Sequence, residues 1–139
     1  MKAQNYLGNY RALYRQKERL TDELKVINAR IDAGAGSIRY DKDPVVSSTN
    51  YDSMRLVDRK IDLELVLADT IKELTALRSD MARIFERMPN RYRRIAELTW
   101  FDFEGAVYIA QQVGCSLKTV YNRRHDVIRI VQEFIDQNA

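Results

Sequence analysis

Cysteine and histidine are nearly absent from this chain, which contains one of each, Cys115 and His125. A single cysteine cannot form an internal disulfide, and one cysteine with one histidine cannot supply the ligand cluster of a zinc site. His125 has no partner that would make it a general base, and Cys115 has no histidine near it in sequence. We therefore expect both residues to be structural, and a protein that is not an enzyme and uses no metal or cofactor.

Long apolar runs are also missing. The uninterrupted apolar stretches are only a few residues long, and the first 20 residues are polar and charged. We expect neither a membrane span nor a signal peptide, and hence a cytoplasmic protein. The net charge of +3 is mildly basic, so it permits nucleic-acid binding without requiring it. A length of 139 residues suits one small domain with an elongated helical appendage.

A heptad pattern begins at Tyr6. Its core positions step alternately by four and three residues, and no proline interrupts them before Gly34. The seam consists of Tyr6, Tyr10, Leu13, Lys17, Leu20, Leu24, Ile27 and Ile31. This spacing predicts a helix of about 30 residues with a coiled-coil face. Lys17 on the seam either fixes register and oligomeric state or extends its stem to solvent at an edge.

A break in the pattern follows over residues 33–50. Gly34, Gly36, Pro44 and a cluster of small polar residues at 47–50 disfavour a helix there, and we predict a loop. Residues 40–46 form a small apolar group inside this polar segment. They either dock on the neighbouring helices or belong to a flexible linker.

A second long helix is predicted over residues 51–88, with Asn50 or Asp52 as its N-cap and Pro89 marking its end. It carries two apolar stripes. One stripe contains Leu56, Leu63, Leu67, Leu74, Leu77, Met81, Ile84 and Met88, and the other contains Met54, Val57, Ile61, Leu65, Ala68 and Ile71. Two stripes indicate two partners, and we predict a homodimer or higher homo-oligomer. The alternative is one wide face within a single chain.

Shorter helices are predicted after Pro89, over residues 90–98, from 103 or 104 to 113, and from 116 to about 137. With Ala106 as first position, the last two match a helix-turn-helix: Ala110 is fifth, Gly114 ninth and Val120 fifteenth. The motif needs a small residue at the fifth position, a positive φ at the ninth and a buried side chain at the fifteenth. The expected fold is all-α, with a coiled-coil module over residues 1–88 and a helix-turn-helix domain over residues 89–139.

The second helix of such a motif lies in the DNA major groove, so its first turns provide candidate DNA contacts. These are Ser116, Leu117, Lys118, Thr119, Tyr121, Asn122, Arg123 and Arg124. Asn122 can pair with adenine, and Lys118 can reach guanine or phosphate, although either residue could instead be a solvated surface position. Arg123 stands where the motif normally has an apolar residue, so its stem is expected to pack.

Arg91 and Arg94 belong to an arginine cluster near residue 89 that either contacts phosphates or forms surface ion pairs with neighbouring acidic residues. An aromatic group follows at Trp100, Phe101 and Phe103. In so small a domain we expect these three rings in the core rather than stacked on bases.

A family resemblance is carried by residues 88–98 together with Ile109, Ala110, the run Gly114, Cys115, Ser116, and Val120. These residues resemble the helix-turn-helix of bacterial sigma factor region 4, which recognises promoter DNA. The whole layout is more closely similar to phage-encoded late-transcription regulators of the ArpU/RinA type, through residues 40–48 and 116–128. The resemblance implies an activator of phage late genes that reads bases with residues 116–123. Arg123 and the run 101–105 depart from the usual pattern.

Two other functions fit the same layout. An oligomeric DNA-packaging adaptor, such as a phage small terminase subunit, also joins a helix-turn-helix to a helical assembly segment. A sigma-like module could instead bind RNA polymerase or a sigma partner without contacting DNA. Double-stranded DNA and a second copy of the chain are the partners that the leading hypothesis requires.

Overall fold

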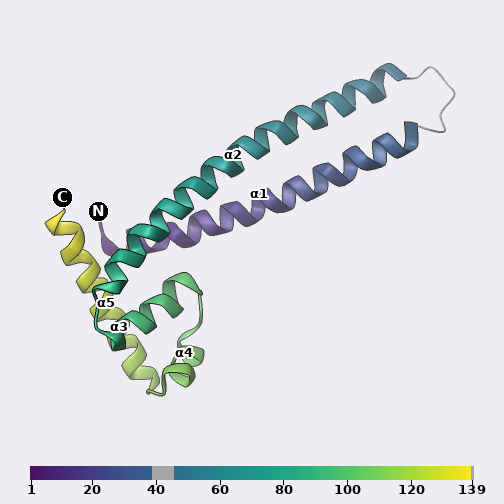
Figure 1. Ribbon diagram of the computed structural model, residues 1–139. Helices are drawn as coiled ribbons and strands as arrows, with labels where there is room; N and C mark the ends of the chain where they lie inside the picture. The colour runs from purple at the N-terminus through teal and green to yellow at the C-terminus, as the bar shows by residue number, and fades with distance from the viewer. Residues whose placement is uncertain (39–45, 139) are drawn as a thin grey trace. The chain divides into compact units, whose positions relative to one another are not determined.

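The computed structural model describes residues 1–38 and 46–138, with side chains described for residues 1–34 and 52–138. These residues form five α-helices and no strand, so the protein is all-α, as predicted (Figure 1). The helices are α1 (Ala3–Ile38), α2 (Val46–Glu86), α3 (Asn90–Ala96), α4 (Ala106–Val113) and α5 (Leu117–Gln137), and a π-helical segment, η1 (Glu97–Phe101), directly follows α3.

Each of the two long helices includes more residues than the sequence predicts. The predicted loop over residues 33–50 is wrong at both ends, because α1 continues through Gly34 and Gly36 to Ile38 and α2 begins at Val46; its middle, residues 39–45, lies outside the described residues. Glycine costs a helix only about 1 kcal/mol per residue and removes no hydrogen-bond donor, so long helices tolerate it. Asn50 and Asp52 lie inside α2 and are not its N-cap. The apolar group at 40–46 lies almost entirely outside the described residues.

The contacts divide the chain into two compact units. The first unit comprises Met1–Tyr14 and Glu73–Ala139, and the second comprises Arg15–Lys72. Both long helices therefore contribute one end to each unit. The boundary predicted at residue 88 falls inside the first unit.

The second unit is an antiparallel pair of helical segments from α1 and α2 (Figure 1). Its core consists of seam residues from both helices: Leu20, Leu24, Ile27 and Leu63, with Ile31 and Leu67 packed against them. These contacts confirm the predicted heptad seam. Lys17 is half-buried on it. Thr70 is buried on the α2 side, and its hydroxyl donates to the carbonyl of Val66 at 2.9 Å.

The first unit has a larger core, in which the ends of the long helices pack on α5 and on the aromatic group. Its fully buried members include Leu7, Met81, Phe85, Val127 and Val131. The aromatic group packs against this core, as predicted. Phe85 lies 5.1 Å from Phe101 and 6.5 Å from Trp100 between ring centroids. Arg78 stacks over Phe101 at 4.4 Å.

The segment between α3 and α4 departs from its predicted boundaries. The helix predicted to end at residue 98 runs on as η1 to Phe101, and α4 begins at Ala106 instead of residue 103 or 104. Phe103 has φ of 56°, in the left-handed region that non-glycine residues rarely adopt. Its ring packs 5.8 Å from Tyr10 and 5.3 Å from Tyr14. Phe103 thus combines an unusual backbone conformation with aromatic packing directly before α4.

Candidate nucleic-acid interface

The turn between α4 and α5 has the geometry that the motif predicts. Gly114 has φ of 74° and ψ of 42°, and its N–H donates to the carbonyl of Ala110 at 2.9 Å. The N–H of Cys115 donates to the same carbonyl at 3.1 Å. Two residues later Ser116 caps α5, because its hydroxyl oxygen accepts a hydrogen bond from the N–H of Thr119 at 3.2 Å. α4 therefore ends and α5 begins within three residues.

A small separate core fixes α5 on α4. Ile95, Ile109 and Val120 are fully buried against one another. Ala106, Ala110, Val113 and Cys115 pack around them, together with Leu98. The structure thus confirms a packed small residue at Ala110, a positive φ at Gly114 and a buried side chain at Val120. A rigidly held second helix is the structural requirement for a recognition helix.

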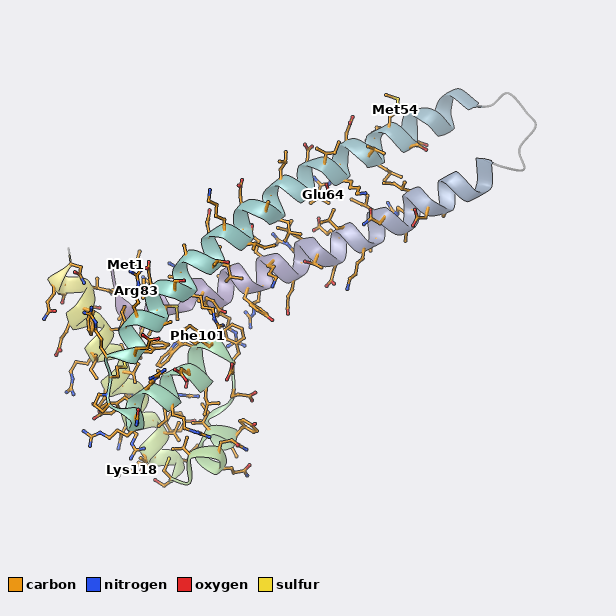
Figure 2. The ribbon with its side chains drawn as sticks, viewed as in Figure 1. Met1, Met54, Glu64, Arg83, Phe101 and Lys118 are labelled. Carbon is orange, nitrogen blue, oxygen red and sulfur yellow. The ribbon has the colours of Figure 1, made fainter. Side chains whose placement is uncertain are left out.

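One face of α5 is exposed along about three turns. Tyr121 and Asn122 follow Lys118 by three and four residues, and His125 and Arg129 continue the row at the same spacing; all five side chains are exposed. The opposite face carries the buried residues Val120, Val127 and Val131. Lys118 lies in the first turn, next to the α4–α5 connection (Figure 2). We call these five exposed residues the α5 face.

The structure places the predicted contact residues in different environments. Lys118, Tyr121 and Asn122 belong to the α5 face, and Leu117 beside it is also exposed. Ser116 and Thr119 are joined by the capping bond and by a hydroxyl–hydroxyl hydrogen bond of 2.8 Å. Those two side chains are therefore engaged in starting the helix.

Arg124 is engaged inside the protein. Its Nε donates to the Thr99 hydroxyl at 3.2 Å, and a terminal nitrogen donates to the Glu104 carbonyl at 3.4 Å. The same guanidinium lies 5.8 Å from the ring centre of Tyr121. Arg124 thus ties the segment before α4 to α5, which leaves it less available to phosphates than predicted. Arg123 is half-buried, in accord with the expected packing of its stem.

Arg91 is brought close to the α5 face by a chain of contacts. Its guanidinium stacks over Tyr92 at 4.9 Å, and the Tyr92 hydroxyl donates to Asp126 Oδ2 at 3.2 Å. Asp126 Oδ1 also pairs with Arg129 at 3.4 Å. Arg129, which is exposed, thus lies beside the Asp126 carboxylate, and the exposed Arg91 is linked to that carboxylate only through Tyr92. Arg94 is exposed one helical turn after Arg91, whereas Arg93 pairs with Glu97 at 3.0 Å.

His125 is a member of the face that the sequence interpretation missed, since it was expected to be structural and is instead exposed. The three-or-four-residue spacing that starts at Lys118 could have identified both His125 and Arg129. The first ten residues of this segment, 116–125, contain Lys118, Arg123 and Arg124 but no Asp or Glu. The helix thus presents a locally positive end, which suits a polyanion.

The described part of the chain was also searched for a metal site and for a membrane-spanning helix. No group of three or more His, Cys, Asp or Glu residues there could hold a metal ion. None of the helices described is both long enough and apolar enough to cross a membrane. Comparisons with protein-family models, with curated proteins and with solved structures give no match.

Proposed function

We propose that this protein binds double-stranded DNA in a sequence-specific manner and regulates transcription, with α5 as its recognition helix. The observation that carries the proposal is the α5 face: an exposed, basic and amide-bearing surface, with no acidic residue over 116–125, on a helix that begins directly after a glycine turn. The exposed stretch from Lys118 to Arg129 is about 17 Å long at 1.5 Å per residue. A major groove about 12 Å wide admits such a helix.

The chemistry of the face suits direct reading of base edges. Asn122 can donate to and accept from adenine in a bidentate pair, and Lys118 can donate to the O6 and N7 of guanine. Leu117 and Tyr121, both exposed, offer apolar surface to thymine methyl groups. Arg91, Arg94 and Arg129 extend the positive surface beyond the first two turns, where they would contact phosphates and fix the orientation of the helix.

Transcription regulation, rather than DNA binding alone, is supported by the resemblance to sigma factor region 4. The similarity in layout to ArpU/RinA-type regulators narrows the proposal to activation of phage late genes in the bacterial cytoplasm. RNA polymerase is a further partner under this proposal, since a sigma-like module acts beside it.

The proposal is tested by measuring the affinity of the purified chain for duplex DNA from around its own gene, by fluorescence anisotropy at two salt concentrations. We expect affinity to fall steeply with salt, because each phosphate contact releases counterions. Lys118→Ala and Asn122→Ala are each expected to weaken binding by about 1–3 kcal/mol, roughly 5- to 150-fold. The matched controls, Lys25→Ala and Asn28→Ala on exposed positions of α1, should bind as the parent does.

Three results would overturn the proposal. Unchanged affinity in both α5 variants would remove α5 as the recognition helix. Absence of DNA affinity in the parent, with retention of purified RNA polymerase, would favour the polymerase-binding module instead. A ring of many subunits that binds DNA would favour the packaging adaptor.

A further inference from the structure

Asp126 is an acidic residue at the edge of the α5 face. It is the only Asp or Glu of α5 before Glu133. It follows Asn122 by four residues, slightly more than one helical turn, and therefore lies on nearly the same side of the helix. Its side chain is 33% exposed. A negative charge at this position opposes the binding of a polyanion, so its place beside a basic surface requires an explanation.

The Asp126 carboxylate is held in place from the side of α3. The Tyr92 hydroxyl donates a hydrogen bond to Asp126 Oδ2 at 3.2 Å. The Tyr92 side chain is half-buried and packs against the core of the first unit. A carboxylate that is bonded to a packed side chain has fewer rotamers open to it. The negative charge therefore stays at this edge of the α5 face.

Arg129 is the exposed partner of this carboxylate. One terminal nitrogen of its guanidinium lies 3.4 Å from Asp126 Oδ1, and the Arg129 side chain is 68% exposed. Ion pairs as exposed as this one are weak, because water and salt screen them. A guanidinium binds a phosphate in the same way as it binds a carboxylate. A DNA phosphate can therefore replace Asp126 as the partner of Arg129.

We propose that Asp126 competes with DNA phosphates for Arg129 and thereby lowers the affinity of the α5 face for DNA of every sequence. Two effects of Asp126 act in this direction: its charge repels phosphates, and its pair with Arg129 must break before that guanidinium contacts the backbone. Phosphate contacts carry no sequence information, so the lowering is uniform across sequences. Base contacts such as that of Asn122 then contribute a larger share of the binding free energy. This role rests on the proposed function, because it requires DNA at the α5 face.

Asp126→Asn tests this role, because it removes the charge and keeps an oxygen that can accept from Tyr92. Affinity is measured by fluorescence anisotropy over a series of salt concentrations, for the duplex from around the gene and for a duplex of shuffled sequence. Both affinities should rise by about 3- to 10-fold, and the slope of log affinity against log salt should steepen by about 0.9, the value for one added phosphate contact. The control Asp69→Asn makes the same change in net charge at an exposed position of the second unit and should bind as the parent does.

A double-mutant cycle with Arg129→Ala shows whether Asp126 acts through Arg129. In the parent, Asp126→Asn releases the guanidinium and removes the repulsion, whereas in the Arg129→Ala background it removes the repulsion alone. The gain in affinity from Asp126→Asn should therefore be smaller in the Arg129→Ala background. Equal gains in the two backgrounds would show that the carboxylate acts on DNA directly, and would overturn the competition for Arg129. A loss of packing would lower the helical circular dichroism and would not steepen the salt dependence.

Failure of this role and failure of the proposed function give different results. A parent that binds neither duplex would overturn both. A parent that binds DNA and is weakened by Asn122→Ala, but whose affinity is unchanged by Asp126→Asn, would overturn the role of Asp126 alone. A fall in affinity on Asp126→Asn would also overturn it, because the carboxylate would then orient Arg129 toward the DNA backbone instead of competing for it.

Discussion

Replacement of Gly114 by alanine isolates the energetic role of the turn between α4 and α5. Gly114 has φ of 74°, and a Cβ added there would meet no atom within 4 Å. The substitution is therefore sterically free, and its cost is conformational alone. For an L-residue with a Cβ the left-handed region costs about 1–2 kcal/mol, so Gly114→Ala should lower the free energy of unfolding by about that amount.

Gly8 supplies a matched comparison of opposite sign. It lies inside α1, and its added Cβ would also meet nothing within 4 Å. Gly8→Ala should raise the free energy of unfolding by about 0.5–1 kcal/mol, because alanine loses less backbone entropy in a helix. Gly114→Asn should lose less stability than Gly114→Ala, since asparagine tolerates the left-handed region better.

Urea denaturation of the three variants and the parent, followed by circular dichroism at 222 nm, measures these differences. The reasoning requires the two alanine variants to shift the midpoint in opposite directions. A Gly114→Ala variant as stable as the parent would show that the turn does not hold its left-handed conformation in solution.

Two further predictions concern other residues of the first unit. Ser116→Ala should cost about 1 kcal/mol in urea denaturation, because it removes the acceptor for the Thr119 N–H at the start of α5; no loss would mean that the cap is not formed. The pKa of Tyr6 is raised from 10.0, first by burial and then by Asp80, with Arg83 opposing. The folded state therefore keeps this proton to higher pH than the unfolded state, and the stabilisation is lost as pH rises above 10. Denaturation at pH 9 and pH 11 should show a smaller decline for Tyr6→Phe than for the parent, and equal declines would contradict this.

The helix-turn-helix could be predicted from sequence because its requirements are local. Gly114 adopts positive φ where few other residues can, Ala110 leaves room for the second helix, and Val120 fills the space between them. All three demands lie within eleven residues of one another, so spacing alone identifies them. The heptad seam of α1 and the apolar stripe of α2 that packs on it were predictable for the same reason, since helical periodicity repeats the requirement at every turn.

Features that depend on distant residues could not be predicted in this way. Phe85 belongs to no predicted stripe, yet it is fully buried because Trp100 and Phe101 fold over it. Phe103, just before the late start of α4, packs against tyrosines about 90 residues earlier in the chain.

Arg124 illustrates the same difficulty in the candidate site. Its residue type and position suggested a phosphate contact, but its hydrogen-bond partners Thr99 and Glu104 come from another segment of the chain. Conversely, His125 was taken as structural because no partner would make it a general base, although its register with Lys118 places it on the exposed face. Residue type was a weaker guide than helical position.

The central claim, that the α5 face reads base edges, is tested most directly by selecting preferred duplexes from a random DNA library with the parent and with Asn122→Ala. We predict that the parent selects a defined sequence containing an adenine, and that Asn122→Ala relaxes the preference at that position while keeping the preferences elsewhere. Selection of the same sequence with the same stringency by both proteins would contradict the assignment of α5 as the recognition helix.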